Sequence, residues 1–326
     1  MLAVWYDGQG RADEVLQVGE LPDPQPGPGE VHVRVRFSGV NPGDTKKRLG
    51  WLGSSMPYPR VIPHSDAAGV IDAVGEGVDP ARIGRRVWVY GAQSYRPFGT
   101  AAEFTVIPAQ LAIDLPDGVP DEVGACLGIP GITAHRAVFA DGPVAGTTVL
   151  VHGVLGSVGN LAAQLAHWGG ATVIGSVRRS ADLNSVTGSA VAHAVALDQP
   201  DPAAAIRAHA SDGVDRIIEV AFSNNIDLDA AVAKNTTIIA AYATRRERPD
   251  FPFWPMLFDN ITIRLLGSDD FPVTAKAQAT EDLTAAASAG ALSITIGAPL
   301  PLRQAAQAHD RVDAGSRSRI LLAIPD

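Results

Sequence analysis

The stretch that decides the fold is "TTVLVHGVLGSVGNLAAQLAHWGGATVIGSVRR", residues 147–179. An apolar run enters a turn in which Gly153, Gly156 and Gly159 are spaced by three, and a segment with helical periodicity leaves it. That segment ends at Gly169–Gly170, as helices often do, and a second apolar run follows. The order strand, glycine turn, helix, strand is the context in which such a turn binds the pyrophosphate of a dinucleotide.

Each glycine of this turn has a separate physical role. Gly153 permits the sharp bend out of the strand, Gly156 lets a pyrophosphate approach the backbone, and Gly159 lets the helix pack closely on the sheet. The first turn of the helix then offers unpaired N–H groups and a partial positive charge to the phosphates. We therefore predict a dinucleotide-binding turn here, in place of an ordinary glycine turn.

The end of the second strand selects the cofactor. NAD-binding sites usually carry an Asp or Glu about 20 residues beyond the glycines, which accepts from the ribose hydroxyls. Here the strand ends in Arg178 and Arg179, and no carboxylate follows before Asp182. Two guanidinium groups suit the 2′-phosphate of NADPH, with Ser176 as a further hydroxyl donor. Asp198 would repel that phosphate if it came close, and a solvated basic loop is the alternative interpretation of the two arginines.

Two parts of the chain differ in their pattern of apolar and polar residues. Residues 1–122 carry short alternating runs such as "EVHVRVRFSGV" (30–40), which are typical of half-buried strands. In residues 123–270, strand patterns alternate with helical patterns, which indicates a doubly wound parallel sheet. The expected strands are 148–152, 172–176, 193–197, 215–220, 236–241 and 261–267. The expected helical segments are 158–168, 180–187, 202–210, 226–234 and 254–259. A helix at 274–289 and a strand within "ALSITIGAPLPL" (291–302) follow. We therefore predict a discontinuous first domain, 1–122 with 271–326, and a nucleotide domain, 123–270.

Composition excludes several classes of function. The formal net charge of −9 disfavours nucleic acid and anionic membrane surfaces as partners. Cys126 is the single cysteine, so an intramolecular disulfide and an all-cysteine zinc site are impossible. No apolar run approaches the roughly 20 residues of a membrane span, and the N-terminal residues show no signal-peptide pattern. We expect a cytoplasmic protein.

Several segments, taken together and in order, resemble one family. They are "SGVNPGDTKKRLG" (38–50), "IPHSDAAGVIDAVGEGV" (62–78), "GRRVWVYG" (84–91), "GTAAEFTVIP" (99–108), "CLGIPGITAHRAV" (126–138) and "GSRSRILL" (315–322), besides the glycine turn. The chain resembles the medium-chain dehydrogenase/reductase superfamily and, within it, the zinc-independent quinone oxidoreductase (zeta-crystallin-like) branch. The resemblance implies an α/β fold, a GroES-like β-barrel catalytic domain plus a Rossmann doubly wound nucleotide-binding domain, with the cofactor between them. It also implies a homodimer joined through "NITIRLLGSDD" (260–270).

The resemblance also implies the site residues. In this branch the positions of Asn41 and Asp44 lie near the nicotinamide ribose and the reacting end, and the position of Thr133 contacts the nicotinamide. Cofactor-binding positions further along the chain are Gly156, Ser157, Val158 and Gly159 in the pyrophosphate turn, and Arg319. We interpret Tyr242, with Phe253 and Trp254, as lining the cofactor and acceptor region.

Zinc-dependent relatives carry a Cys where this chain has Asn41, and a His–Glu pair where it has Ser65–Asp66. His64 stands one position early, and such a shift on a strand turns a side chain to the other face. We therefore expect no catalytic zinc. The tyrosines common after the Asn–Asp pair are replaced here, so Lys46 or Lys47 could bind an acceptor oxygen; a solvated basic surface is the alternative interpretation.

Without zinc, hydride transfer runs most readily from NADPH to an electrophilic acceptor, a quinone or an α,β-unsaturated carbonyl. The sequence thus predicts an enzyme, a zinc-independent NADPH-dependent oxidoreductase acting on a small carbonyl or quinone acceptor. Two alternatives stay open: an enoyl-thioester reductase of the same fold, and a non-catalytic, crystallin-like NADPH-binding protein.

Overall fold

The computed structural model of the chain describes residues 1–325, which divide into two compact units. The first unit is residues 1–130 with the C-terminal residues from 294 to 325, and the second is residues 131–293. The predicted boundaries lay at 122/123 and 270/271. Helix α9 (Val273–Ser288), which the sequence analysis placed with the first domain, packs in the second unit, where Leu283 contacts Gly131 and Asp282 contacts His135.

The long strand β3 organises the first unit. One of its edges pairs with β4 along most of its length. The other edge pairs first with β6, opposite Glu30–Arg34, and then with β15, opposite Phe37–Val40. The strands of the unit are β1 (Leu2–Trp5), β2 (Gln17–Glu20), β3 (Glu30–Val40), β4 (Asp66–Val74), β5 (Arg86–Val89), β6 (Phe104–Pro108), β7 (Ala112–Asp114), β14 (Leu300–Pro301) and β15 (Ile320–Ala323).

Buried apolar and more exposed polar side chains alternate along these strands, and the buried ones form the core of the first unit. In β3, Val31, Val33 and Val35 are buried, as the period of two predicts. They join a cluster that includes residues of the C-terminal segment, such as Leu322, so this segment completes the core. The helices of the unit are α1 (Ala12–Val15), α2 (Pro42–Leu49), α3 (Asp121–Gly124) and α10 (Ala305–Asp313).

The second unit is a six-stranded parallel sheet in the order β10-β9-β8-β11-β12-β13. Its strands are β8 (Thr148–His152), β9 (Thr172–Val177), β10 (His193–Ala196), β11 (Val214–Glu219), β12 (Ala233–Ala241) and β13 (Thr262–Leu265). Its helices are α4 (Ile129–Phe139, beginning at the unit boundary), α5 (Ser157–Trp168), α6 (Pro202–Arg207), α7 (Phe222–Val232), α8 (Phe253–Phe258) and α9.

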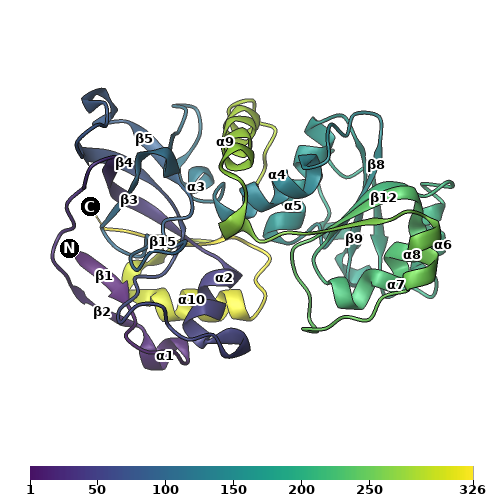
Figure 1. The fold of residues 1–326 in the computed structure, drawn as a ribbon, viewed down its shortest axis with the longest axis horizontal. Helices are drawn as coiled ribbons and strands as arrows, with labels where there is room; N and C mark the ends of the chain where they lie inside the picture. Colours follow the sequence, from purple (N-terminus) through teal and green to yellow (C-terminus); the bar gives the residue numbers. More distant parts are fainter. Residues whose placement is uncertain (326) are drawn as a thin grey trace. The chain divides into compact units, whose positions relative to one another are not determined.

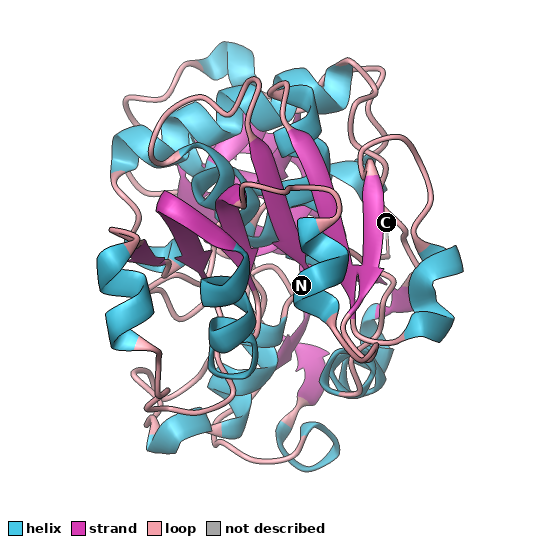
Figure 2. Ribbon diagram, turned by 90° about the vertical axis from the view of Figure 1, so that its right-hand side faces the viewer, coloured by secondary structure: helices cyan, strands magenta, loops and turns pink. Residues whose placement is uncertain are grey.

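Helices cover both faces of this sheet, as expected for a doubly wound fold. Figure 1 shows α4 and α5 on one side of β8 and β9, and α6, α7 and α8 on the other. Figure 2 colours the same strands magenta with cyan helices on either side. Ile206, Phe222 and Met256, from α6, α7 and α8, share one core with the buried strand residues.

Several expected elements differ from the structure, among them one strand and two helices. The strand expected within 291–302 is reduced to the two-residue β14 and an isolated bridge between Ile296 and Arg319, because prolines at 299 and 301 remove ladder donors. The helix expected at 180–187 is a 3-10 helix over Ser180–Ser185. Helix α7 begins at Phe222, four residues before the expected start. In residues 1–325, no helix has both the length and the apolar character that crossing a membrane requires.

Candidate active site

A buried polar network surrounds Asn41 in the first unit. Asn41 lies at the start of α2, and both ends of its side-chain amide are held: Nδ2 donates to Asp66 Oδ2 at 2.6 Å, and Oδ1 accepts from Arg319 Nη1 at 3.0 Å. Arg319 Nη1 also donates to the carbonyl of Val40 at 3.1 Å. Asp66 Oδ1 accepts from the backbone N–H of Ile129 at 2.8 Å. The structure thus joins Asn41 and Arg319, two predicted site residues 278 positions apart.

Asp44 adds a buried carboxyl to this network. It is the third residue of α2, and its Oδ2 accepts from the backbone N–H of Asn41 at 2.8 Å. Burial raises the pKa of Asp44 to about 7, although Lys47 and the Asn41 N–H favour the charged form. Only 4% of the residue is exposed. Asp44 is therefore a carboxyl that keeps its proton close to neutral pH, where general acids are most effective.

The two lysines that follow have different partners. Lys46 Nζ lies 4.4 Å from the ring centroid of Trp51, a cation–π contact. Lys47 Nζ donates to Gln93 Oε1 at 3.2 Å. Both lysine side chains are half-buried, whereas Trp51 is 45% exposed. The last turn of α2 and the residues that follow it therefore present a cation and an aromatic face.

A directional hydrogen-bonded chain supports the start of β4. Arg48 Nε, which can only donate, bonds His309 Nδ1 at 3.3 Å, so neutral His309 carries its proton on Nε2 and donates it to His64 Nε2 at 2.9 Å. His64 then donates from Nδ1 to Ser38, and Ser38 donates to Thr100. Thr100 finally donates to the backbone carbonyl at the first position of β4 at 2.8 Å.

Burial, and then nearby positive charge, lowers the pKa of both imidazoles in this chain. The pKa of His309 falls to about 3, with Arg48 adding to the effect of burial. The pKa of His64 also falls well below its usual value, so both rings are neutral. His64 has a left-handed backbone (φ 76°), which is costly for a residue with a Cβ. Its side chain points into this chain of hydrogen bonds, with Ser38 and His309 as its partners.

The glycine turn of the second unit has the geometry of an anion cradle. Gly153 adopts φ 66°, and its carbonyl accepts from the N–H of Gly156, the N-cap of α5, at 2.9 Å. A Cβ on Gly159 would lie 2.3 Å from the carbonyl oxygen of Gly153, so no other residue fits there. Among residues 1–325, no side chain caps the N-terminus of α5, which begins Ser157–Val158. Such a helix start leaves N–H groups available for phosphate oxygens, so the turn fits a dinucleotide.

The predicted basic pair follows the strand next to this cradle. Arg178 and Arg179 follow β9 directly and are exposed. Asp198 is held next to them, because its Oδ1 accepts from the N–H and the hydroxyl of Ser180 at 2.8 and 2.6 Å. These bonds and the charge of Arg179 lower the pKa of Asp198. A carboxylate is therefore fixed near Arg179, one of the two predicted arginines.

The remaining predicted residues have the following places. Ser176 is completely buried, and its hydroxyl bonds His152 Nδ1 at 2.7 Å, so it lies behind the surface on which Arg178 stands. Thr133 is buried in α4. Tyr242 follows β12, and its N–H donates to the carbonyl of Glu219 at 3.1 Å.

Residues 27–117 match the alcohol dehydrogenase GroES-like domain family. Over 322 residues, the chain is 30% identical to the quinone oxidoreductase of Rattus norvegicus, a match that covers 95% of this chain and 94% of the relative. The chain belongs to the quinone oxidoreductase family. This family lies in the medium-chain dehydrogenase/reductase superfamily, so the predicted resemblance is confirmed. The chain is accordingly an oxidoreductase, and its superfamily binds nicotinamide cofactors.

Solved structures agree with the family fold. The structure of mycobacterial Rv1454c complexed with NADPH matches with a TM-score of 0.84 and 25% identity, covering 99% of both chains. The CurK enoyl reductase matches with a TM-score of 0.85 at 18% identity, again covering 99% of both chains, which supports the fold alone. The predicted fold class, a GroES-like domain with a Rossmann domain, is confirmed.

Several polar residues of this network were missed in the sequence analysis. Asp66 was considered only as part of a lost zinc pair, yet its carboxylate holds Asn41. Its place one residue before "AAG" was the available signal. Gln93 and His309 gave none, because their partners Lys47 and His64 lie 46 and 245 positions away.

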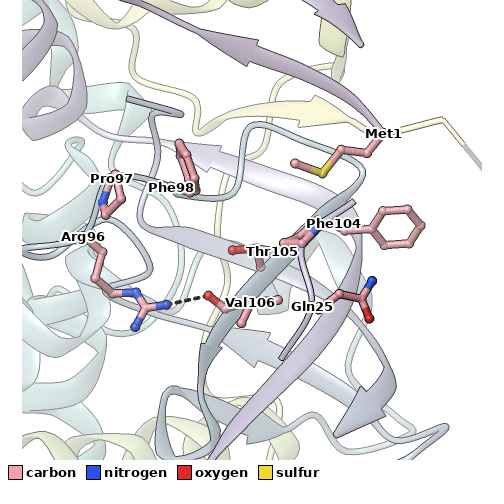
Figure 3. Close-up of a pocket in the computed structure, with 9 residues that line it drawn as sticks. Met1, Gln25, Arg96, Pro97, Phe98, Phe104, Thr105 and Val106 are labelled. Atoms are coloured by element: carbon pink, nitrogen blue, oxygen red, sulfur yellow. Dashed lines mark hydrogen bonds between the residues drawn. The ribbon is translucent and has the colours of Figure 1, made fainter. Parts of the chain in front are cut away.

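Two pockets lie away from these residues. One, of about 210 Å³ in the first unit, is lined by Phe98, Phe104 and their neighbours, with Arg96 donating to the Val106 carbonyl at its edge (Figure 3). The other, of about 250 Å³ in the second unit, lies beside the His135–Asp282 pair. No predicted site residue lines either pocket.

Proposed function

We propose that this quinone oxidoreductase family member is a zinc-independent enzyme that transfers hydride from NADPH to a quinone or α,β-unsaturated carbonyl. The observation that carries the choice of cofactor is the exposed Arg178–Arg179 pair at the end of β9, beside the α5 cradle. Paired guanidinium groups fit a 2′-phosphate. The NADPH held by the mycobacterial neighbour adds support.

The proposal of zinc independence rests on the Asn41 network. The positions that hold zinc in other branches are Asn41, Ser65 and Asp66 here, and none supplies a thiolate or imidazole. Arg319 Nη2 lies 3.9 Å from Asp66 Oδ2, and its Nη1 bonds Asn41. A guanidinium therefore already supplies the positive charge at these two side chains, which opposes a divalent cation.

Bound NADPH would supply the hydride, and the residues of the first unit would orient the acceptor and handle the proton. The protonated carboxyl of Asp44 is suited to donate to an acceptor oxygen that gains negative charge. Asn41 and Arg319 hold the start of α2, and with it Asp44, in place. Lys46 and Trp51 offer a cation and an aromatic face to a planar acceptor.

The test is a fluorescence titration with NADPH and NADH on the wild type and the Arg178→Ala/Arg179→Ala variant, followed by a turnover assay on quinones, enones and an enoyl thioester. We expect NADPH to bind at least about tenfold more tightly than NADH, a difference of about 1.4 kcal/mol, and the double variant to lose this preference. Equal binding of both cofactors to the wild type would contradict the arginine clamp. Failure of NADPH to support turnover of any acceptor would contradict the enzymatic proposal.

A further inference from the structure

A second set of buried ionisable groups lies in the nucleotide unit and is absent from the proposed function. His152 is the last residue of β8, Glu219 is the last residue of β11, and Asp229 lies in α7. All three have no exposed surface. His152 Nε2 lies 2.9 Å from Asp229 Oδ1 and 3.7 Å from Glu219 Oε2, and three potential ligand atoms lie within 4.8 Å of one another.

One carboxylate oxygen of this cluster has no partner among the described residues, although burial raises the pKa of Glu219 to about 7 and so lowers the negative charge of the cluster. Two carboxylates face one imidazole, and His152 is the ion-pair partner of both. Asp229 Oδ2 is a buried oxygen with no hydrogen-bond partner in residues 1–325. A buried, uncompensated carboxylate is costly. One divalent cation with two carboxylates and a neutral imidazole gives a net charge of zero.

The distances and the supporting contacts also fit a cation. Ligands about 2.1 Å from a tetrahedral zinc ion lie about 3.4 Å from one another, and the two observed separations, 2.9 and 3.7 Å, fall on either side of this value. Ser176 holds the other nitrogen of His152, and Asn225 Nδ2 donates to both oxygens of Glu219 at 3.1 Å. Such outer contacts typically orient metal ligands.

We propose that His152, Glu219 and Asp229 form a structural site for a first-row divalent cation, of which zinc is the natural probe. One imidazole nitrogen and carboxylate oxygens form a ligand set that suits such ions. The site ties β8, β11 and α7 together directly behind the glycine turn. It is separate from the position of the catalytic zinc in other branches, which corresponds to Asn41 in the first unit.

The test is the zinc content of full-length protein expressed in zinc-supplemented medium and then dialysed. We expect about one zinc ion per chain in the wild type and a loss of at least about tenfold in Asp229→Asn and Glu219→Gln, which keep the side-chain shapes. The control is His209→Ala, because His209 stacks with His193 at a centroid distance of 3.9 Å near the surface and could bind zinc adventitiously. This control should keep its zinc.

Three results would overturn the proposal: no zinc in the wild type, full zinc in Asp229→Asn, or loss of zinc only in His209→Ala. If the two carboxylate variants fail to fold, the X-ray absorption spectrum of the wild type decides. Oxygen ligands with a single imidazole support the site, whereas two imidazoles or sulfur refute it. NADPH titration of the same samples tests the cofactor proposal independently, because that binding depends on the glycine turn and the arginines.

Discussion

Asp44 offers the sharpest test of the active-site electrostatics. The pKa of its carboxyl is about 7 in the folded chain and about 3.9 in an unfolded one. The folded value is the higher one, so this group stabilises the fold fully at low pH and loses that contribution as the pH rises from about 4 to 7. Above pH 7 the folded chain holds a buried carboxylate.

The two pKa values of Asp44 determine how much its carboxyl changes the free energy of unfolding between pH 4 and pH 8. Compared with a permanently neutral group, the carboxyl of Asp44 lowers the free energy of unfolding by about 4 kcal/mol at pH 8 and by less than about 1 kcal/mol at pH 4. Asp44→Asn removes the charge and keeps an oxygen that can accept from the N–H of Asn41. We therefore expect the variant to gain about 3–4 kcal/mol relative to wild type between pH 4 and pH 8.

Urea unfolding of both proteins at pH 4, 5, 6, 7 and 8 measures this difference, with Asp117→Asn as an exposed control. The control should differ from wild type by a nearly constant amount. If the difference between Asp44→Asn and wild type is also constant, the carboxyl of Asp44 ionises normally and cannot hold the proton assigned to it. In acceptor turnover, Asp44→Asn should lower kcat/KM and remove the decline above pH 7.

Three further predictions concern the nucleotide unit. Gly159→Ala places a Cβ 2.3 Å from the Gly153 carbonyl oxygen, so thermal unfolding should show a loss of about 1–3 kcal/mol or more, whereas Gly267→Ala, with open space around it, should change little. Asp198→Asn removes a negative charge beside the arginine pair, so titration should show a several-fold gain in NADPH affinity and none for NADH; equal gains would refute the repulsion. The dimer expected through β13 should dissociate in light scattering when Leu265, 75% exposed on this edge strand, becomes Asp; a monomeric wild type would contradict the dimer.

The elements that the sequence predicted well have strong local signals. Strand β8 has the predicted bounds, and α5 begins one residue early, because an apolar run, spaced glycines and a helical period coincide there. Helix α7 began four residues before its expected start because "FSNN" looks like a loop. In the fold, Phe222 is buried and Asn225 bonds Glu219, so tertiary contacts favour the helix over local propensity.

Only those site residues that lie in a recognisable sequence motif could be predicted from the sequence. Asn41, Asp44 and Arg319 came from resemblance, and the structure adds the physical reason for their proximity: Asp66 and Arg319 hold the Asn41 amide from opposite ends. No periodicity or spacing marks the contact between Arg48 and His309, 261 positions apart. Such contacts form when β15 and α10 return to the first unit, so they depend on the assembled fold.

Two buried histidines show why burial alone does not predict a charge. His309 and His152 are both completely buried. The pKa of His309 falls to about 3 because burial and the neighbouring Arg48 both oppose a second positive charge. Burial also opposes the charged form of His152, but the hydrogen bond to Asp229 and the charges of Asp229 and Glu219 outweigh it and raise the pKa. The first histidine therefore serves as a neutral link in a hydrogen-bonded chain, whereas the second stands among carboxylates that require a positive charge, supplied by a proton or, as we propose, by a metal ion.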